Sequence, residues 1–514
     1  MEILKYFALF YYFNSLSLMD PTNEKPNNYL LYGNSKGKPK PIGVISELPE
    51  IRVTYKKQLP DSLKQNLIAI EDKRFFSHKG IDYKSIARAI YVNLRSFSIK
   101  QGGSTITQQL ARNLLKDNRK IISRKIKEIQ LALDIERTHT KDQILELYFN
   151  YVYWGKNLYG IRAASITYFD KEPHHLTKYE KTQLLTLLRG PNLYLRNYLA
   201  FQKRVALINE IIEKNSKSRN RCRTKKMAKP MNVKNSLTTF KPSVLKYLNL
   251  KVNHSNSSIH TTIEFDLQKM LDFLVNEAKY PTSIVCFYNG QLVGFSSFYG
   301  TDYPFSFKSN VGSLLKPFIY TFLRKNGLKK DEQFSTQSDS KWHVREVNSD
   351  DKTSMKLYEA LKVSNNNVFI NASNKIKIDK VIRFIATLTN KTQEKLYPSA
   401  ILGASHTGMS LFEITKLYHD YFSKSNDTET AECLEILNEL LVEKTGSIIS
   451  NGFFKTGTTN NNRERFSIFG NKIMTVGILR QNYFENDYTK EGNFLGYVRE
   501  VLRKIISLKR KWFN

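Results

Sequence analysis

A change of pattern near the middle of the chain limits its fold more than any other feature. From Leu63 to about Ile212, apolar residues recur at three- and four-residue spacing in one segment after another, as in amphipathic helices. After about Ser258, short apolar runs of strand type appear, with helical segments between them. The 514 residues therefore predict a mainly α domain over 43–212 and a mixed α and β domain over 259–510.

Local signals mark individual elements in both parts. The helical pattern is clearest in LKQNLIAIEDKRFF, YKSIARAIYVNL, TITQQLARNLL, RKIKEIQLALDIER, KDQILELYFNYV and EKTQLLTLLRG. Asp82, Thr140 and Thr177 are expected to cap three of these helices, because their side-chain oxygens accept hydrogen bonds from the first turn. Asn289-Gly290 predicts a hairpin, and GFFKTGTT, RFSIFG and KIMTVGILR predict successive strands.

Three further segments lie outside the two domains. Ile3–Met19 makes residues 1–20 a candidate membrane anchor or signal segment, although its 17 residues fall short of the ~20 that a spanning helix needs. Residues 20–42 are rich in Asn, Pro, Gly and Lys, which predicts an extended connector. Basic residues dominate Glu213–Lys229, which predicts a basic linker over 213–258.

The charge balance is strongly positive, since 80 Lys and Arg residues against 47 Asp and Glu residues give a net charge of +33. This favours an anionic partner, either nucleic acid, a phosphate-bearing ligand or an anionic membrane. The basic run has no interleaved aromatic residues, so a nucleic-acid arm has no support. Cys222, Cys286 and Cys433 exclude a disulfide scaffold and lack the Cys-x-x-Cys spacing of many zinc sites.

The candidate chemistry of the first domain depends on two carboxylates. Glu71 belongs to EDKRFFSHKG, and Glu128 follows Arg124 and Lys125 in RKIKE. The loop-like GGSTITQQ between them begins a helix, whose backbone amides favour an anion. These groups suit a transfer in which one acid acts as a base and a phosphate leaves. The alternative is that both acids are solvated or cap helices, and that His78 forms only structural hydrogen bonds.

Five blocks in order, EDKRFFSHKG, GGSTITQQLARNL, RKIKEIQLALDIE, KDQILELYFN and LLTLLRGPN, resemble the peptidoglycan glycosyltransferases. The resemblance covers roughly Leu63 to Asn197 and is to the family 51 domain of bifunctional class A penicillin-binding proteins, a mainly α, lysozyme-like domain. It implies that Glu71 deprotonates the attacking sugar hydroxyl and that Glu128 assists at the diphosphate of the donor. The implied substrate-binding residues are Asp72, Ser104, Thr105, Gln108, Gln109, Arg124 and Lys125.

The resemblance also implies a reaction. Lipid-linked disaccharide-peptide units (lipid II) are joined into glycan strands, and undecaprenyl diphosphate is released. No cofactor and no metal ligand are implied, although a divalent cation near the donor diphosphate is compatible with the reaction. Glu146 and Asn150, in the fourth block, are expected to give mainly structural support.

The second domain contains a Ser-x-x-Lys, a Ser-x-Asn and a Lys-Thr-Gly motif in that order. Ser313 and Lys316 are selected from several Ser-x-x-Lys pairs because GSLLKPFIYTFLRKNG continues as an amphipathic helix, on which residues three apart share a face. Lys455-Thr456-Gly457 is selected over Lys444-Thr445-Gly446, because only the former follows an apolar strand and precedes another. Ser364 and Asn366 form the middle motif.

These motifs resemble the penicillin-binding transpeptidase fold, a β-lactamase-like α/β domain with an antiparallel sheet flanked by helices. The resemblance implies that Ser313 is the acylated nucleophile, Lys316 its base, and Ser364 and Asn366 a proton relay. It implies that Lys455 and Thr456 bind the donor carboxylate and that Gly457 and Thr458, which follow in the same strand, are also substrate-binding residues. The backbone amides of Ser313 and Thr458 would form the oxyanion hole. Phe453-Phe454 departs from the small residues that are usual there and is expected to narrow the cleft.

The two resemblances together predict a bifunctional peptidoglycan synthase that is also a D-Ala-D-Ala transpeptidase. Its expected partners are the lipid-linked precursor, glycan strands, stem peptides, β-lactams and an anionic membrane, with no nucleic acid. The expected location is the cytoplasmic membrane, with the catalytic domains on its extracytoplasmic side. One alternative is an active glycosyltransferase whose serine domain is degenerate, binding penicillin but crosslinking weakly. A β-lactamase or sensor and a nucleic-acid-binding protein are the remaining alternatives.

Overall fold

The computed structural model describes residues 30–45, 51–55, 57–96, 102–115, 122–215, 237–248, 251–253, 258–337, 353–392, 397–404, 407–446, 449, 451–459, 463–481 and 491–508. The candidate anchor and most of the basic linker lie outside these ranges. Within them, no helix combines the length and the apolar character that crossing a membrane requires.

The chain divides into two compact units, which are described separately. The first, here the helical unit, comprises Met1–Tyr32, Pro41–Pro242 and Val252–Ile259. The second, here the mixed unit, comprises Gly33–Lys40, Ser243–Lys251 and His260–Asn514.

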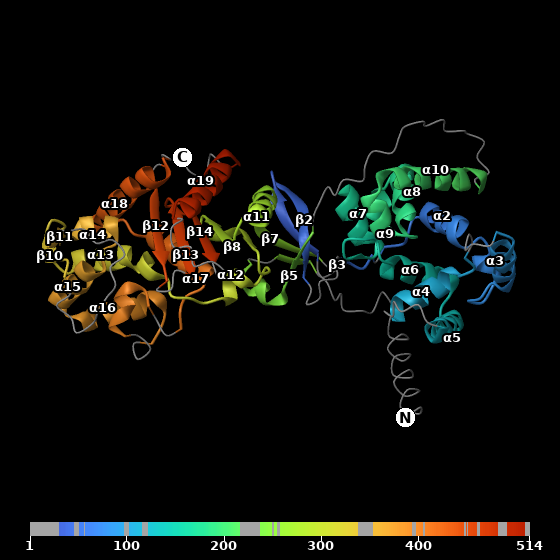
Figure 1. The fold of residues 1–514 in the computed structure, drawn as a ribbon, viewed down its shortest axis with the longest axis horizontal. Coiled ribbons are helices and arrows are strands. Elements are labelled where there is room, and N and C mark those ends of the chain that lie inside the picture. Colours follow the sequence, from blue (N-terminus) through green and yellow to red (C-terminus); the bar gives the residue numbers. More distant parts are fainter. Residues whose placement is uncertain are drawn as a thin grey trace, which may run out of the picture. The chain divides into compact units, whose positions relative to one another are not determined.

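The helical unit is built almost entirely of helices (Figure 1). They are α2 (Asp61–Glu71), α3 (Tyr83–Ser96), α4 (Ile106–Leu115), α5 (Ile122–Thr138), α6 (Lys141–Tyr151), α7 (Ile161–Phe169), α8 (Lys178–Leu187), α9 (Pro191–Arg196) and α10 (Tyr198–Asn215), with short turns η1 (Phe75–Ser77) and η2 (Pro173–His175). The strands β3 (Ile51–Arg52) and β4 (Leu158–Tyr159) form a small parallel pair. The prediction of a mainly α domain is confirmed.

The three predicted helix caps are confirmed. The Asp82 carboxylate accepts hydrogen bonds from the amides of Lys84 and Ser85 at the start of α3, at 3.1 and 3.2 Å. Thr140 begins α6 and Thr177 begins α8, and each forms a reciprocal capping box with the residue three positions on. The helix boundaries therefore follow from local chemistry.

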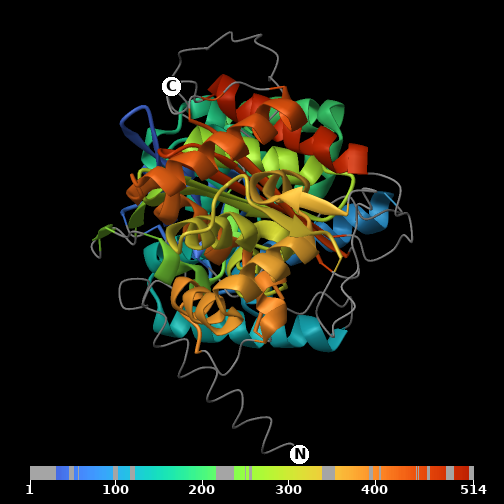
Figure 2. The same ribbon diagram turned by 90° about the vertical axis from the view of Figure 1, so that its left-hand side faces the viewer.

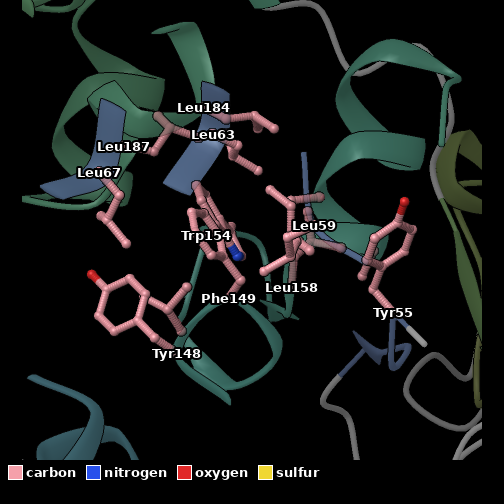
Figure 3. Packing of buried hydrophobic residues seen from close by; sticks show 14 of the residues in the cluster. Tyr55, Leu59, Leu63, Leu67, Tyr148, Phe149, Trp154, Leu158, Leu184 and Leu187 are labelled. Carbon is pink, nitrogen blue, oxygen red and sulfur yellow. The ribbon is translucent and has the colours of Figure 1, made fainter. Parts of the chain in front are cut away.

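The core of the helical unit is centred on Trp154, which is fully buried (Figure 3). Its ring stacks on Phe149 with a centroid separation of 6.5 Å and an interplanar angle of 13°. Leucines from α2 and α8 pack around it, including Leu63 and Leu184. Because α2 ends at Glu71, this packing fixes the position from which that carboxylate projects.

The expectation of an extended connector over residues 20–42 is wrong where the structure describes it. Leu30–Ser35 forms β1 and Lys38–Ile45 forms β2, joined by a two-residue turn. The turn residues Lys36 and Gly37 have φ values of 50° and 80°, as a type I′ hairpin requires. Pro39 and Pro41 made a strand look unlikely in the sequence, because proline has no backbone N–H group to donate to a neighbouring strand. Pairing of β2 with β5 (Thr238–Phe240) avoids both, because it involves only Gly43–Ile45.

The mixed unit contains a five-stranded antiparallel sheet in the order β12-β13-β14-β8-β9. Its strands are β8 (Thr282–Tyr288), β9 (Gln291–Ser297), β12 (Phe453–Thr458), β13 (Glu464–Gly470) and β14 (Met474–Gln481). Its helices are α11 (Phe265–Glu277), α12 (Tyr303–Ser306), α13 (Lys316–Lys325), α14 (Leu357–Val363), α15 (Asn366–Ile376), α16 (Ile378–Thr389), α17 (Leu411–Lys424), α18 (Thr428–Thr445) and α19 (Glu491–Leu508). Figure 2 shows helices of residues 357–389, coloured yellow to orange, on the near side of this unit.

The remaining elements are short strands and turns. They are β6 (Lys251–Asn253), β7 (Ser258–Glu264), β10 (Gln333–Ser335) and β11 (Ser354–Lys356), with the turns η3 (Pro242–Tyr247), η5 (Gly312–Leu315) and η7 (Pro398–Leu402). A second five-stranded sheet has the order β5-β2-β1-β7-β6, and β10 pairs with β11.

Alternating side chains place helices on both faces of the β12-β13-β14-β8-β9 sheet. Met474, Val476 and Ile478 of β14 belong to a core cluster that also contains residues of α11 and α19. On the other face, a Cβ atom at Gly477 would lie 1.9 Å from the Thr415 Oγ1 atom of α17. The prediction of an antiparallel sheet flanked by helices is confirmed.

A buried histidine joins α17 to this sheet and generates a stability prediction. His419 Nε2 accepts a hydrogen bond of 2.8 Å from the Gly290 amide, in the turn between β8 and β9. Burial lowers the pKa of His419, so the folded state holds the neutral ring. The resulting stability is present above the unfolded pKa of about 6.5 and is lost as the pH falls below it.

We therefore expect the melting temperature to fall between pH 7.5 and pH 5.5, and to fall less in His419→Gln, which cannot titrate. Thermal unfolding of both proteins across this pH range, followed by circular dichroism, measures the difference. Equal pH dependence in the two proteins would contradict the assignment.

Two candidate active sites

The first site is centred on Glu71 at the end of α2. Its side chain is 6% exposed, and Arg189 Nε lies 3.4 Å from Oε1. Gln109 Nε2 of α4 donates to Glu71 Oε2 at 3.4 Å, and the Tyr148 hydroxyl donates to Gln109 Oε1 at 3.0 Å. Burial, and secondarily the charge of Glu71, raise the pKa of Tyr148, so this hydroxyl remains protonated. The Glu71 carboxylate is thus held by the Gln109 amide on one oxygen and faces the Arg189 guanidinium with the other.

The second carboxylate, Glu128 of α5, is fully buried among three cations. Arg112 Nε and Arg124 Nε lie 3.1 and 3.2 Å from Oε1, and Lys125 Nζ lies 3.0 Å from Oε2. Lys125 Nζ also donates to the Ser104 hydroxyl at 3.0 Å. A buried carboxylate requires such partners, because its desolvation is costly. The Arg112 and Lys125 side chains remain 39% and 38% exposed, so they are accessible to a ligand.

Helix α4 connects the two carboxylates. Gln109 contacts Glu71, and Arg112, three residues later, contacts Glu128. Residues three apart on a helix are neighbours on one face. The structure therefore brings together the two acids that the sequence predicts, with α4 between them.

Three of the other predicted residues have buried partners within the protein. Asp72 accepts hydrogen bonds of 3.0 Å from both His78 Nε2 and the Ile106 amide at the start of α4. The Thr105 hydroxyl accepts from the Gln108 amide at 3.1 Å, and Gln108 Oε1 accepts from the Thr105 amide at 3.2 Å. This reciprocal pair is a capping box. All three side chains fix the start of α4, on which Gln109 and Arg112 depend.

Asn150 has the supporting contacts that the sequence predicts. Its Oδ1 atom accepts from the Tyr55 amide at 2.8 Å, and its Nδ2 atom donates to the Glu146 carbonyl at 3.0 Å. Arg112 and Arg189, by contrast, were missed by the sequence interpretation. Arg112 could have been found, since it follows Gln109 by one helical turn in the same block. Arg189 comes from a separate block and offered no comparable signal.

The candidate site of the mixed unit joins three separate motifs through hydrogen bonds. Ser313 lies in η5, and Lys316 begins α13 one turn later. Lys316 Nζ is buried and donates to the Ser364 carbonyl and, at 2.7 Å, to Asn366 Oδ1. Lys455 Nζ donates to the Ser364 hydroxyl. The predicted residues Lys316, Ser364, Asn366 and Lys455 thus form one connected network.

The middle motif lies between two helices. Ser364 ends α14 in the left-handed conformation, with φ of 59° and ψ of 37°. Asn365 then caps α15, and its side chain accepts from the Val368 amide at 2.9 Å. Ser364 and Asn366 are thereby fixed by the backbone at a helix end and a helix start.

Strand β12 approaches the turn before Ser313 so closely that neither backbone has room for a side chain. A Cβ atom at Gly457 would lie 2.2 Å from the Val311 carbonyl oxygen. A Cβ atom at Gly312, where φ is +56°, would lie 2.5 Å from the Thr458 carbonyl oxygen. Glycine at both positions therefore allows the Lys-Thr-Gly strand to lie against the Ser313 turn.

The other Lys-Thr-Gly sequence lies at a helix end, and the two phenylalanines that begin β12 are buried. Lys444-Thr445-Gly446 ends α18, with Gly446 in the left-handed conformation, so rejecting it as the strand motif was correct. The narrowing of a cleft by Phe453 and Phe454 is not observed, because both rings are buried. Phe453 packs against Phe422 of α17 with a centroid separation of 5.1 Å.

Lys455 is buried, and this burial lowers its pKa to about 8. At neutral pH the side chain is mainly an ammonium group that carries little water. An anionic ligand reaching it would restore the interactions that desolvation removes. Lys455 is thus a suitable partner for a carboxylate.

Comparison with known proteins agrees with this arrangement. Residues 39–213 match the Transglycosylase family model. Penicillin-binding protein 1F of Bacillus subtilis (strain 168) is 44% identical over 137 residues, which are 27% of this chain and 19% of that protein. Penicillin-binding protein 1B of Buchnera aphidicola subsp. Baizongia pistaciae (strain Bp) is 27% identical over 83% of this chain and 68% of that protein.

Among solved structures, penicillin-binding protein 1A from Haemophilus influenzae matches with a TM-score of 0.47 and 13% identity, over 93% of this chain and 92% of that one. The matches to proteins 1F and 1B span about a fifth and about two thirds of those proteins. On the sequence matches, the chain is similar to penicillin-binding proteins over most of its length, and its residues 39–213 match the Transglycosylase family.

Proposed function

We propose that this protein is a bifunctional peptidoglycan synthase, which polymerises lipid II into glycan strands and crosslinks their stem peptides through an acyl-serine intermediate. The relationship to class A penicillin-binding proteins supports peptidoglycan synthesis by both domains. The observation that carries the proposal most is the connected network of Lys316, Asn366, Ser364 and Lys455, in which Lys316 follows Ser313 by one helical turn. A degenerate serine domain would not be expected to retain it.

In the polymerisation step, Glu71 removes the proton from the attacking sugar hydroxyl. The new glycosidic bond forms as the bond from the donor sugar to its diphosphate breaks. Gln109 orients the carboxylate of Glu71, and Tyr148 orients Gln109 in turn. A base held in one position near its substrate contributes typically 10²–10⁴-fold to such a reaction.

The leaving diphosphate is stabilised by the cations around Glu128. Arg112, Arg124 and Lys125 provide three positive charges against one carboxylate, and two of them are more than a third exposed. Charge that develops on the diphosphate therefore meets groups that are already oriented. Glu128 keeps these cations in place and is itself shielded from solvent.

A divalent cation fits poorly at this carboxylate. Its two oxygens already contact three cations, and the described residues contain no group of three or more His, Cys, Asp or Glu that could hold a metal ion. No step of the proposed reaction is therefore assigned to a metal. Arg112, Arg124 and Lys125 supply the positive charge instead.

In the crosslinking step, Ser313 attacks the carbonyl of the penultimate D-alanine of a stem peptide. Lys316 accepts the hydroxyl proton, and the terminal D-alanine leaves after receiving a proton through the Ser364 relay. Lys316 Nζ donates to the Ser364 carbonyl and to Asn366 Oδ1, and in its neutral form it has a lone pair that can accept this proton. An amine of a second stem peptide then attacks the ester and forms the amide crosslink, the acyl–oxygen bond breaks, and the proton lost by the amine returns through Lys316 to the Ser313 oxygen.

The partners and location follow from this substrate and belong to the same proposal. The lipid-linked precursor places the reaction at the cytoplasmic membrane, on its extracytoplasmic side. The net charge of +33 suits an anionic membrane surface. β-Lactams would acylate Ser313, with their carboxylate against Lys455 and Thr456. Nucleic acid is not among the proposed partners.

Replacing Glu71 tests the polymerisation mechanism. Glu71→Gln keeps the shape of the side chain but cannot accept a proton, so glycan synthesis should fall by ~10²-fold or more. Asp61→Asn, an exposed acid at the other end of α2, is the matched control and should retain activity. The assay measures glycan strands from purified lipid II, with penicillin labelling as a check on folding. Near-normal polymerisation in Glu71→Gln would remove Glu71 from the mechanism.

Replacing Ser313 separates the two activities. Ser313→Ala should abolish covalent penicillin labelling and crosslinking, because the acyl acceptor is lost, while polymerisation continues. Mass spectrometry of the labelled wild-type protein should locate the adduct on Ser313. An adduct on another serine, such as Ser243 in η3, would overturn this assignment.

The lowered pKa of Lys455 predicts a pH dependence. The ammonium form binds the carboxylate of penicillin, so wild-type labelling should decline as the pH rises through about 8. Lys455→Arg stays protonated and should label more slowly at pH 7 but without this decline. Stopped-flow labelling between pH 6 and pH 10 measures both profiles. The same decline in Lys455→Arg would show that another group causes it.

A further inference from the structure

Helix α18 contacts the segments that carry all three motifs of the mixed unit, although no motif residue lies on it. It packs against α13, which begins at Lys316, against α14, which precedes Ser364, and against β12, which contains Lys455. The labels of these elements lie together in Figure 1. The residues of α18 that make the polar contacts belong to none of the three motifs.

The contact with α13 is an ion pair with an additional hydroxyl. Arg324 Nε and Nη2 lie 2.8 and 2.9 Å from the two carboxylate oxygens of Glu432, and the Tyr320 hydroxyl donates to the same carboxylate. The side chains of Arg324 and Glu432 are only 21% and 18% exposed. Such a two-point contact fixes orientation as well as distance. Tyr320, the first residue of α13 in this contact, lies one helical turn after Lys316.

The contact with β12 is made through Asn438. Its Nδ2 atom donates to the Gly452 carbonyl at 2.9 Å and to the Ile449 carbonyl at 3.3 Å. Gly452 immediately precedes the first residue of β12. Asn438 lies six residues after Glu432, or about 9 Å along the helix. Glu439, next to it, pairs with Lys362 of α14, two residues before Ser364.

We propose that Glu432 and Asn438 are positioning residues, through which α18 sets the distance between the nucleophile turn and the Lys-Thr-Gly strand. The inference rests on the proposed transpeptidase function of this unit. Glu432 determines where Lys316 lies, and Asn438 determines where Lys455 lies. Neither touches a substrate. A displacement of about 1 Å in a catalytic group costs up to about 10²-fold in rate, so a small movement of either element is measurable.

The two residues act on different steps, which makes the inference specific. Lys316 takes part in acylation, whereas Lys455 binds the carboxylate of the ligand. Glu432→Gln should therefore lower the first-order rate constant of acylation about tenfold. The half-saturating concentration of penicillin should stay within about twofold of the wild-type value. Asn438→Ala should raise the half-saturating concentration of penicillin about tenfold and change the acylation rate less.

The experiment measures both constants with a fluorescent penicillin and the full-length protein, together with the melting temperature. Glu435→Gln, an exposed acid of the same helix, controls for the change of charge. Ile436→Val, a change at a buried residue of α18, controls for stability, because it removes one buried carbon without touching the polar contacts. Both controls should retain wild-type constants. If Glu432→Gln does not fold, Tyr320→Phe removes one hydrogen bond to the same carboxylate and should lower the acylation rate alone.

Two results would overturn the inference. One is an unchanged acylation rate in Glu432→Gln and Tyr320→Phe while the wild type is labelled on Ser313. The other is an equal loss of rate in Ile436→Val at the same fall in melting temperature, since α18 would then act only through stability. A wild type without label on Ser313 would overturn the proposed transpeptidase function and this inference with it.

Discussion

The contact between the Ser313 turn and β12 is the constraint on which the second site depends. The two backbones approach at Gly312 and Gly457, where a Cβ atom would lie 2.5 and 2.2 Å from a carbonyl oxygen. A third glycine, Gly403, packs on Gly312, and a Cβ atom there would lie 2.0 Å from the Gly312 carbonyl oxygen. A side chain at Gly312 or Gly457 would separate the segments that carry Ser313 and Lys455, and one at Gly403 would displace the Ser313 turn. The proposed oxyanion hole requires amides from both segments, so it depends on the same contact.

In the helical unit, side-chain contacts rather than close backbone contacts hold the parts of the site together. Its two carboxylates come from α2 and α5, and α4 holds them through Gln109 and Arg112. The start of α4 is itself fixed by Asp72, Thr105 and Gln108. Residues that the family resemblance places at the substrate therefore have a physical reason to be retained that does not involve substrate contact.

Local chemistry explains which parts of the fold the sequence could predict. Thr140 and Thr177 form capping boxes within four residues, so their helices were recognised from composition and spacing alone. The β1–β2 hairpin was missed because Pro39 and Pro41 suggest a connector, although its two strands are adjacent in the sequence. Arg189 was missed for a different reason, since only the tertiary fold brings it to Glu71. The choice of Lys455 over Lys444 succeeded because strand periodicity is a local signal.

The two sites keep positive charge available for an anionic substrate in different ways. At Glu128, a buried carboxylate lies between three cations and offsets part of the repulsion among them, and a diphosphate would compete for the same groups. At Lys455, burial instead lowers the pKa to about 8, so the charge is held only weakly until a carboxylate arrives. A carboxylate that binds there would raise this pKa again by linkage, which couples ligand binding to proton uptake. The first arrangement suits a multivalent diphosphate that must be released, and the second suits a single carboxylate whose binding fixes the protonation state of the site.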